Sequence, residues 1–178
     1  MSVKQHVSHD HIRELITRGE VETAGQLLGR AYSMSGRIVS GNQLGRKFGF
    51  PTANLELSGD FIHPKPGVYL GSVEWEEQQA DDMRIFHWNC LISAGYRPTV
   101  GGRSYKVEAY LLDYAGNLYG KQLTVSFLEK IRDELHFTST DDLIKQMHAD
   151  EQLARQKFGL PLQRQINPNN IGVSKNEN

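Results

Sequence analysis

The residues best suited to chemistry in this chain lie in the loop at residues 41–54. Gly41, Gly45 and Gly49 permit close backbone approach and positive φ angles, which a phosphate-binding loop needs. Arg46 adds a positive charge that can pair with phosphate oxygens. The composition therefore fits a phosphate-binding loop. A glycine-rich turn followed by a polar strand has the same composition, so the loop alone leaves both interpretations open.

Two oxygen-bearing side chains, Thr52 and Asn54, follow Pro51 at the end of this loop. Neutral hard oxygens of this kind suit Mg²⁺ or a similar divalent cation. In an extended segment they would face one side and Ala53 the other. They are therefore candidate ligands of a metal ion and its phosphates. The loop is not a Walker A sequence, which needs Gly-Lys followed by Ser or Thr and then a helix.

A carboxylate on a predicted strand is the second candidate for chemistry. Glu108 lies between apolar residues whose spacing predicts a core-facing side of the strand, namely Val107, Ala109 and Leu111. A carboxylate on a rigid strand is a good general base for a hydroxyl nucleophile. A solvated glutamate on an exposed strand face would show the same pattern.

The elements that would position these residues are mostly strands. Five or six short strands with turn residues between them predict an antiparallel barrel or sandwich, without the βαβ alternation of a doubly wound sheet. The predicted strands include residues 35–40, 67–75, 84–93, 105–114 and 122–128, and residues 52–54 are expected to be extended.

Helices are predicted at both ends of the chain. Apolar residues at helical spacing predict a short hairpin of two helices before residue 30, with Leu27 and Leu28 on the inner face of the second. A longer helix is expected from Ser139 or Thr140 to Gly159. Its apolar side carries Leu143, Ile144, Met147, Ala154 and Phe158, while Asp150, Glu151 and Arg155 are placed mostly away from that side.

Composition narrows the class of protein. The 20 Lys and Arg residues against 21 Asp and Glu residues give a net charge of −1, which does not fit a general polyanion binder, so nucleic acid is not an expected partner. No apolar run reaches the roughly 18 residues of a membrane helix, and no secretory signal begins the chain. Cys90 is the only cysteine, so an intramolecular disulfide is impossible. A cytoplasmic monomer is expected.

Several segments, in order and at similar spacing over residues 32–158, resemble the riboflavin kinase family. They are Gly49-Phe50-Pro51-Thr52-Ala53-Asn54-Leu55, Gly67-Val68-Tyr69, Gly95-Tyr96-Arg97-Pro98-Thr99, Val107 to Asp113, Leu118-Tyr119-Gly120, the spaced Arg132, Glu134 and Phe137, and Ala154-Arg155. The resemblance implies a mainly β fold: a six-stranded antiparallel Greek-key barrel with a C-terminal helix and a short N-terminal helical hairpin. It implies transfer of the ATP γ-phosphate to the riboflavin 5′-hydroxyl, giving FMN and ADP.

The resemblance also implies roles for individual residues. Glu108 would be the catalytic base, and Thr52 and Asn54 would contact the metal, Mg²⁺ or another divalent cation, and the phosphates of ATP. Residues expected near the nucleotide are Gly41, Gly45, Arg46, Asp113 and Tyr119, and those expected near the flavin are Arg132, Glu134 and Phe137. Riboflavin and ATP are the expected small-molecule partners.

Two departures from the family pattern keep a second function open. Ser93 stands where many bacterial relatives carry Asn, and Tyr110 stands where His is frequent. These changes leave room for a catalytically weakened flavin-binding or regulatory module. Residues 1–31 resemble the end of the adenylyltransferase module that precedes this kinase in bifunctional FAD synthases. The rest of that module's motifs are absent, so FMN adenylylation is not expected. The predicted organisation is this helical segment, a kinase barrel at 32–160 and a flexible tail at 161–178.

Overall fold

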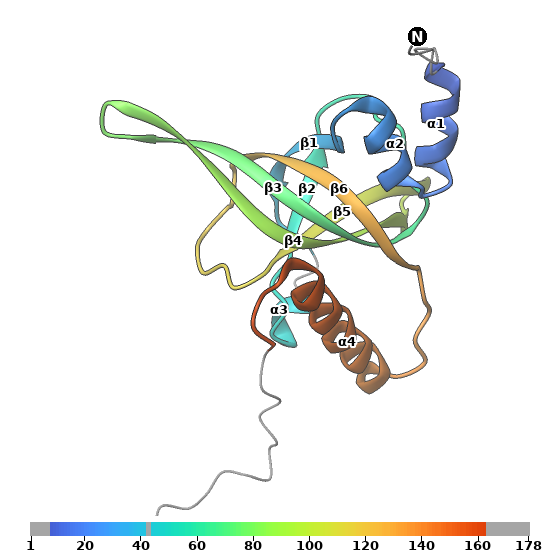
Figure 1. Cartoon of the computed structure of the whole chain (residues 1–178). Helices are drawn as coiled ribbons and strands as arrows, with labels where there is room; N and C mark the ends of the chain where they lie inside the picture. The colour runs from blue at the N-terminus through green and yellow to red at the C-terminus, as the bar shows by residue number, and fades with distance from the viewer. Residues whose placement is uncertain (1–7, 42–43, 163–178) are drawn as a thin grey trace, which may run out of the picture.

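The computed structural model describes residues 8–41 and 44–162. In these residues, six antiparallel strands close into a barrel in the order β1-β2-β5-β4-β3-β6 (Figure 1). The strands are β1 Tyr32–Val39, β2 Ala53–Leu57, β3 Gly67–Gln79, β4 Asp82–Thr99, β5 Gly102–Leu111 and β6 Gln122–Asp133. The helices are α1 His9–Thr17, α2 Val21–Leu28, α3 Leu44–Lys47 and α4 Thr140–Phe158. The four strands in the spatial order β6-β3-β4-β5 form a Greek key, which confirms the expected fold class.

Alternating residues of the strands fill the barrel interior. Val107, Ala109 and Leu111 of β5 are buried in the main hydrophobic core, as their spacing predicts. Cys90 of β4 is buried in the same core, and burial raises the pKa of its thiol, so it is an inert core residue. Glu108 therefore points to the outer face of the barrel wall.

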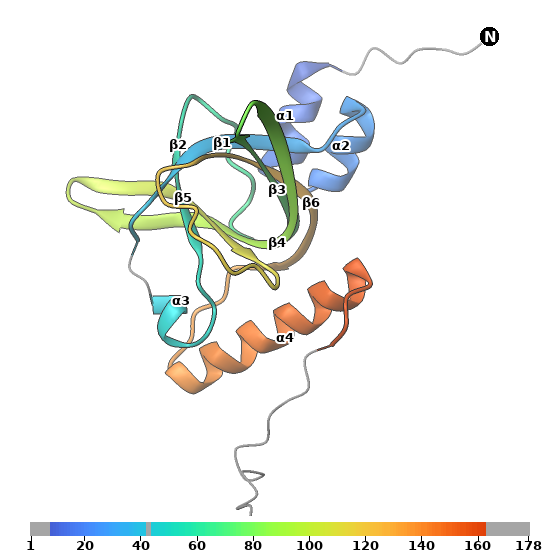
Figure 2. The same ribbon diagram turned by 90° about the vertical axis from the view of Figure 1, so that its left-hand side faces the viewer.

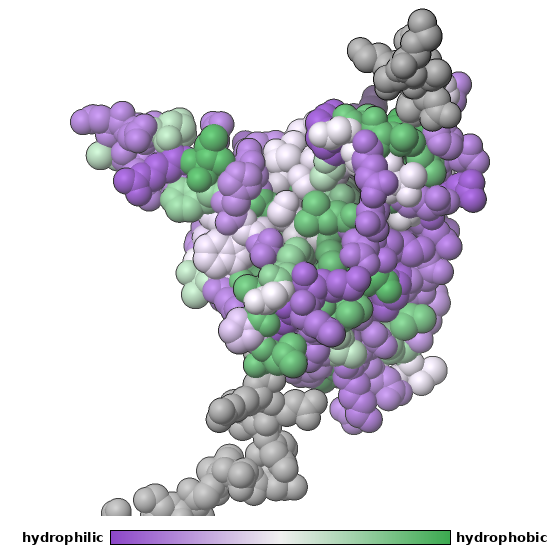
Figure 3. All heavy atoms as spheres, viewed as in Figure 1, coloured by the Kyte–Doolittle hydropathy of each residue, from purple (hydrophilic) through white to green (hydrophobic). Residues whose placement is uncertain are grey.

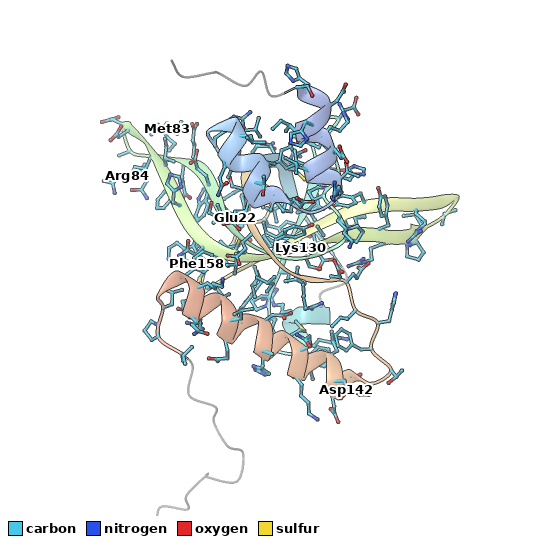
Figure 4. All side chains as sticks on the ribbon, turned by 45° about the vertical axis from the view of Figure 1, so that its right-hand side comes forward. Glu22, Met83, Arg84, Lys130, Asp142 and Phe158 are labelled. Atoms are coloured by element: carbon cyan, nitrogen blue, oxygen red, sulfur yellow. The ribbon has the colours of Figure 1, made fainter. Side chains whose placement is uncertain are left out.

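The β3–β4 hairpin extends beyond the barrel. The two strands pair continuously from Gly67↔Ala94 to Gln79↔Asp82, so both are longer than their apolar segments predict. The projecting end of the hairpin is largely hydrophilic, and the rest of the surface in the same view alternates hydrophilic and small hydrophobic areas (Figure 3). Met83 and Arg84 lie near its tip, well apart from α4 (Figure 4).

The N-terminal helices pack against the barrel rather than standing apart from it. Val21 of α2 belongs to the main core, and α2 contacts β1 and β6. The second helix ends as predicted at Gly29, which adopts the left-handed conformation of a C-cap. Its predicted inner face is wrong in part: Leu27 and Leu28 are 40% and 37% exposed, because Val21 and Ala24 alone turn inward.

The helix α4 lies along the outer wall of the barrel and contacts β4 (Figure 2). Ser139 caps it, accepting a hydrogen bond from the Asp142 backbone N–H at 3.1 Å, and Gly159 ends it. Ala154 packs with a second, smaller cluster on the outer wall that includes Val68, Leu70, Leu91 and Leu112. Phe158 packs on the same cluster, and Asp142 lies at the opposite end of the helix (Figure 4).

Two predictions about the helices need correction. Asp150, Glu151 and Arg155 are buried on α4 rather than turned away from the barrel, because they form ion pairs there. The loop at 41–54 contains a short helix, α3, where only turns were expected. The expected flexible tail falls largely at 163–178, outside the described residues.

Candidate active site

Five strands contribute one residue each to a single row on the outer wall of the barrel. Asn54 of β2 is paired with Glu108 of β5, which is paired with Ser93 of β4. Ser93 is paired with Val68 of β3, and Val68 with Arg132 of β6. Paired residues in antiparallel strands project to the same side. The row therefore forms a continuous floor from Asn54 to Arg132.

A cavity of about 330 Å³ lies over this floor, and all five residues of the row line it. The opposite wall comes from α4, through Leu143, Met147 and Asp150. Its apolar lining is made by Phe48, Phe50, Val68, Leu91, Leu143 and Met147, and its polar lining includes Thr52, Asn54, Ser93, Arg97, Glu108, Tyr110, Arg132 and Asp150. We call it the first cavity. Apolar walls with a few convergent polar groups are typical of a small-molecule site.

A second cavity of about 610 Å³ adjoins the first. It lies between the 41–54 loop, the end of β1 and the turn after β5. Its lining includes Gly41, Arg46, Pro51, Thr52, Ala53, Asn54, Tyr114, Gly116, Asn117 and Tyr119. Thr52 and Asn54 line both cavities, so a group bound between these two side chains would be accessible to ligands in either cavity.

The glycines of the loop make room for these side chains. A Cβ at Gly41 would overlap the side chain of Asn54, and a Cβ at Gly45 would overlap the carbonyl oxygen of Phe50. Gly49 has a φ of 84°, in the left-handed region. The positions at 41 and 45 are therefore glycine because the chain packs closely there, and the one at 49 because of its backbone angle.

Glu108 has an environment unlike that of an ordinary strand glutamate. Burial raises the pKa of its carboxyl, and this effect exceeds the lowering caused by the Arg97 charge, a hydrogen bond from Thr52 and the Lys106 charge. The group lies in the cavity and next to Thr52. A partly buried carboxylate with a raised pKa in a cleft is a candidate for acid–base chemistry.

Two further ion pairs border the first cavity. The guanidinium of Arg132 donates to both oxygens of Asp150 at 2.8 to 3.0 Å, which ties β6 to α4. Arg97 is paired with Glu134, just beyond β6. Arg97 and the residues from α4 were not among the expected site residues. The only sequence signal for Arg97 was its place in the Gly95–Thr99 segment.

Three expected site residues do not line either cavity. Asp113 has a φ of 59° and pairs with Arg155 of α4, which holds the pKa of its carboxyl below the usual range. Glu134 pairs with Arg97, and Phe137 is half-buried in the connection between β6 and α4. The other expected residues, Gly41, Gly45, Arg46, Thr52, Asn54, Glu108, Tyr119 and Arg132, each line at least one cavity.

No cluster of three or more His, Cys, Asp or Glu side chains among the described residues has the arrangement of a metal site. A cation at Thr52 and Asn54 would therefore take neutral oxygens from the protein and its anionic ligands from a bound substrate. Mg²⁺ is often held in this way, with few protein ligands and the phosphates of a nucleotide. The two side chains fit such an ion.

The fold and the site together define a Greek-key barrel protein with two adjoining cavities, the first of which is lined by a carboxylate. The chain belongs to the riboflavin kinase family: the family model described as "Flavokinase: Riboflavin kinase" matches residues 28–158.

The relatives agree with this assignment. A bifunctional riboflavin kinase/FMN adenylyltransferase of Haemophilus influenzae is 38% identical over 154 residues, which are 86% of this chain and 47% of that protein. The chain thus spans about half the length of the curated relatives it matches. A crystal structure of riboflavin kinase from Trypanosoma brucei is similar with a TM-score of 0.52 and 26% identity, covering 72% of this chain and 78% of that one.

A second solved structure, named as a macrolide-efflux protein from Streptococcus pneumoniae, has a TM-score of 0.75 and 35% identity. The match covers 86% of this chain and 48% of that chain. No helix in the described part of the present chain is long and apolar enough to cross a membrane.

Proposed function

We propose that the chain is a riboflavin kinase, transferring the γ-phosphoryl group of ATP to the 5′-hydroxyl of riboflavin to give FMN and ADP. The observation that carries the proposal is the position of Thr52 and Asn54, which line both cavities, beside the carboxylate of Glu108. Two substrates bound in adjoining cavities would meet at these three side chains.

The residues that line each cavity suit a different substrate. The first cavity has apolar walls of Val68 and Leu91 below and Leu143 and Met147 above, which suit a flat aromatic ring system. The second is bordered by Arg46 and by a glycine-containing loop, which suit phosphates. We therefore assign riboflavin to the first cavity and ATP to the second.

The residues at the junction have separate roles. Glu108 accepts the proton of the riboflavin hydroxyl, and its position on β5 fixes the direction of attack. Thr52 and Asn54, which line both cavities, would hold Mg²⁺ and the terminal phosphates of ATP. The metal supplies charge neutralisation on the phosphates. Phosphoryl transfer depends mainly on such positioning and charge stabilisation.

The partly buried setting of Glu108 suits a base. Its raised pKa makes the carboxylate a stronger proton acceptor, while the Arg97 charge and a hydrogen bond from Thr52 favour its ionised form. The ion pairs Arg132–Asp150 and Arg155–Asp113 tie α4 to β6 and to the turn after β5.

The test is a product assay with riboflavin, ATP and Mg²⁺, in which FMN and FAD are measured separately. FMN and no FAD is the expected result. Glu108→Gln keeps the shape of the side chain and removes the base, so kcat should fall by about 10²- to 10⁴-fold. Glu56→Gln is the matched control, since Glu56 is exposed on β2 and lines neither cavity. A Glu108→Gln enzyme with undiminished turnover would exclude this residue as the base.

A catalytically weakened flavin-binding module is the second candidate. Ser93 and Tyr110, the two departures from the family pattern, both line the first cavity. Riboflavin binding without ATP-dependent formation of FMN would support this candidate, and measurable turnover would exclude it.

A further inference from the structure

Arg97 has no role in the function proposed above beyond its effect on Glu108, although its side chain lines the first cavity. It lies on β4 four residues after Ser93, so both project from the outer face of the wall. Its charge is the largest of the charges that lower the pKa of Glu108. Because Arg97 and Glu108 line the same cavity, the guanidinium faces the space in which the hydroxyl of riboflavin would be phosphorylated.

The two arginines that line this cavity are held in different ways. Arg132 donates to both oxygens of Asp150, whose side chain is only 8% exposed and which also accepts from Gln146. Arg97 donates to one oxygen of Glu134 and to the backbone oxygen of Tyr96. Separating Arg132 from Asp150 would leave the buried Asp150 carboxylate unpaired, which is energetically unfavourable. Arg97 and Glu134 are 39% and 32% exposed, so water can solvate Glu134 when the pair opens.

The backbone is built around the Arg97–Glu134 pair. A Cβ at Gly95 would lie 2.8 Å from the Glu134 Oε1 and 3.0 Å from the Arg97 Nη1. Gly95 thus provides the space in which the two side chains meet above the wall.

We propose that Arg97 binds the phosphate of the flavin product, and the phosphoryl group during its transfer, and that Glu134 holds the guanidinium in place while no phosphate is present. This inference rests on the proposed function. A phosphate monoester carries about −1.5 to −2 charges near neutral pH and offers several acceptor oxygens. It is a stronger partner for a guanidinium than a single carboxylate oxygen, since arginine can bind phosphate in a bidentate manner. Riboflavin carries no charge at this position, so it leaves the Arg97–Glu134 pair closed.

The test compares the affinities of the protein for FMN and for riboflavin, each measured without ATP by flavin fluorescence. In Arg97→Gln, the affinity for FMN should fall by about 10- to 100-fold, the range of a charged hydrogen-bonded contact, while that for riboflavin stays within about twofold. Arg97→Lys should lose less affinity for FMN than Arg97→Gln does. Arg103→Gln is the matched control, because Arg103 lies beside Pro98 on the same hairpin, over the ring of Tyr96, and lines neither cavity.

Glu134→Gln tests the second half of the proposal. Without the competing carboxylate, FMN should bind several-fold more tightly and riboflavin should bind as before. Equal losses for both ligands in Arg97→Gln would mean that Arg97 only shapes the cavity, and would overturn the proposal. Weaker binding of both ligands in Glu134→Gln would overturn the role of Glu134 as a placeholder. If the unaltered protein forms FMN, and Arg97→Gln binds FMN as tightly as the unaltered protein does, this inference fails and the proposed function stands.

Discussion

At the scale of single residues, the raised pKa of Glu108 has a consequence for stability as well as for activity. A carboxyl whose pKa is higher in the folded protein favours folding below its unfolded pKa of about 4.3. That contribution is lost as the pH rises through the folded pKa. The ionised form of Glu108 is therefore less favourable in the folded protein than in the unfolded chain.

We expect Glu108→Gln to be more stable than the unaltered protein at pH of about 8, and equally stable at pH of about 4. Thermal unfolding of both proteins across this range measures the difference. Glu56→Gln should show no such pH-dependent gain, since its carboxyl is exposed. A Glu108→Gln protein that is less stable at high pH would show that Arg97 and Thr52 more than compensate for burial.

Gly41 offers a test of Asn54 as the proposed metal ligand without changing Asn54 itself. In Gly41→Ala the new methyl group would overlap the Asn54 side chain, which must then move. We expect the KM for Mg-ATP to rise by about tenfold, the cost of one misplaced contact, while the KM for riboflavin changes little. Steady-state kinetics with each substrate varied in turn separates the two. An unchanged KM for Mg-ATP would mean that Asn54 does not contact the nucleotide or its metal.

The sequence was informative about Thr52, Asn54 and Glu108 because oxygen chemistry and strand alternation are local properties. It was not informative about Arg97 or Asp150. Those two reach the cavity only through the pairing of β4 with β5 and the packing of α4 on the wall, and neither arrangement leaves a local pattern. Sequence spacing also could not show that Asp113 faces α4 rather than a cavity.

At the scale of elements, α4 shows why hydrophobic periodicity placed its charged residues wrongly. The pattern assumes that charges face water, but Arg155 is 2% exposed and bonds to Glu151 and Asp113. Hydrogen bonds to Asp113 and Glu151, together with the charges of these two carboxylates, raise the pKa of Arg155, so it stays charged although it is buried. A buried ion network of this kind is invisible to a count of apolar residues.

Removing Arg155 should therefore detach α4 from the barrel. Arg155→Met leaves Glu151 buried without a partner, and we expect a loss of about 3–5 kcal/mol in the free energy of unfolding. The KM for riboflavin should also rise, because Leu143 and Met147 of α4 line the first cavity. Denaturant unfolding and kinetics measure both effects. Adding Glu151→Gln to Arg155→Met should recover part of the stability, and a double variant no more stable than the single one would contradict this account.

At the scale of the whole molecule, the six strands were predictable from turn spacing, whereas the order in which they close was not. Residues far apart in the sequence, such as Asn54 and Arg132, share one row only because the barrel is closed in that order. That order depends on pairing between strands that are far apart in the sequence, which turn spacing does not show. The site thus depends on the complete barrel, although it lies on the outer wall.

Riboflavin should accordingly stabilise strands that it does not touch. No residue of β1 lines the first cavity, but β1 pairs with β2 and β6, which supply Asn54 and Arg132. If the barrel opens as one cooperative unit, core amides of β1 exchange with solvent only when the whole barrel unfolds. At riboflavin concentrations about 100 times its Kd, hydrogen exchange of these amides should slow by about 100-fold, the same factor as in β5. Protection confined to α4 and the 41–54 loop would mean instead that the site folds locally around its ligand. Because the row joins five strands through backbone hydrogen bonds, we expect the slowing to extend to β1.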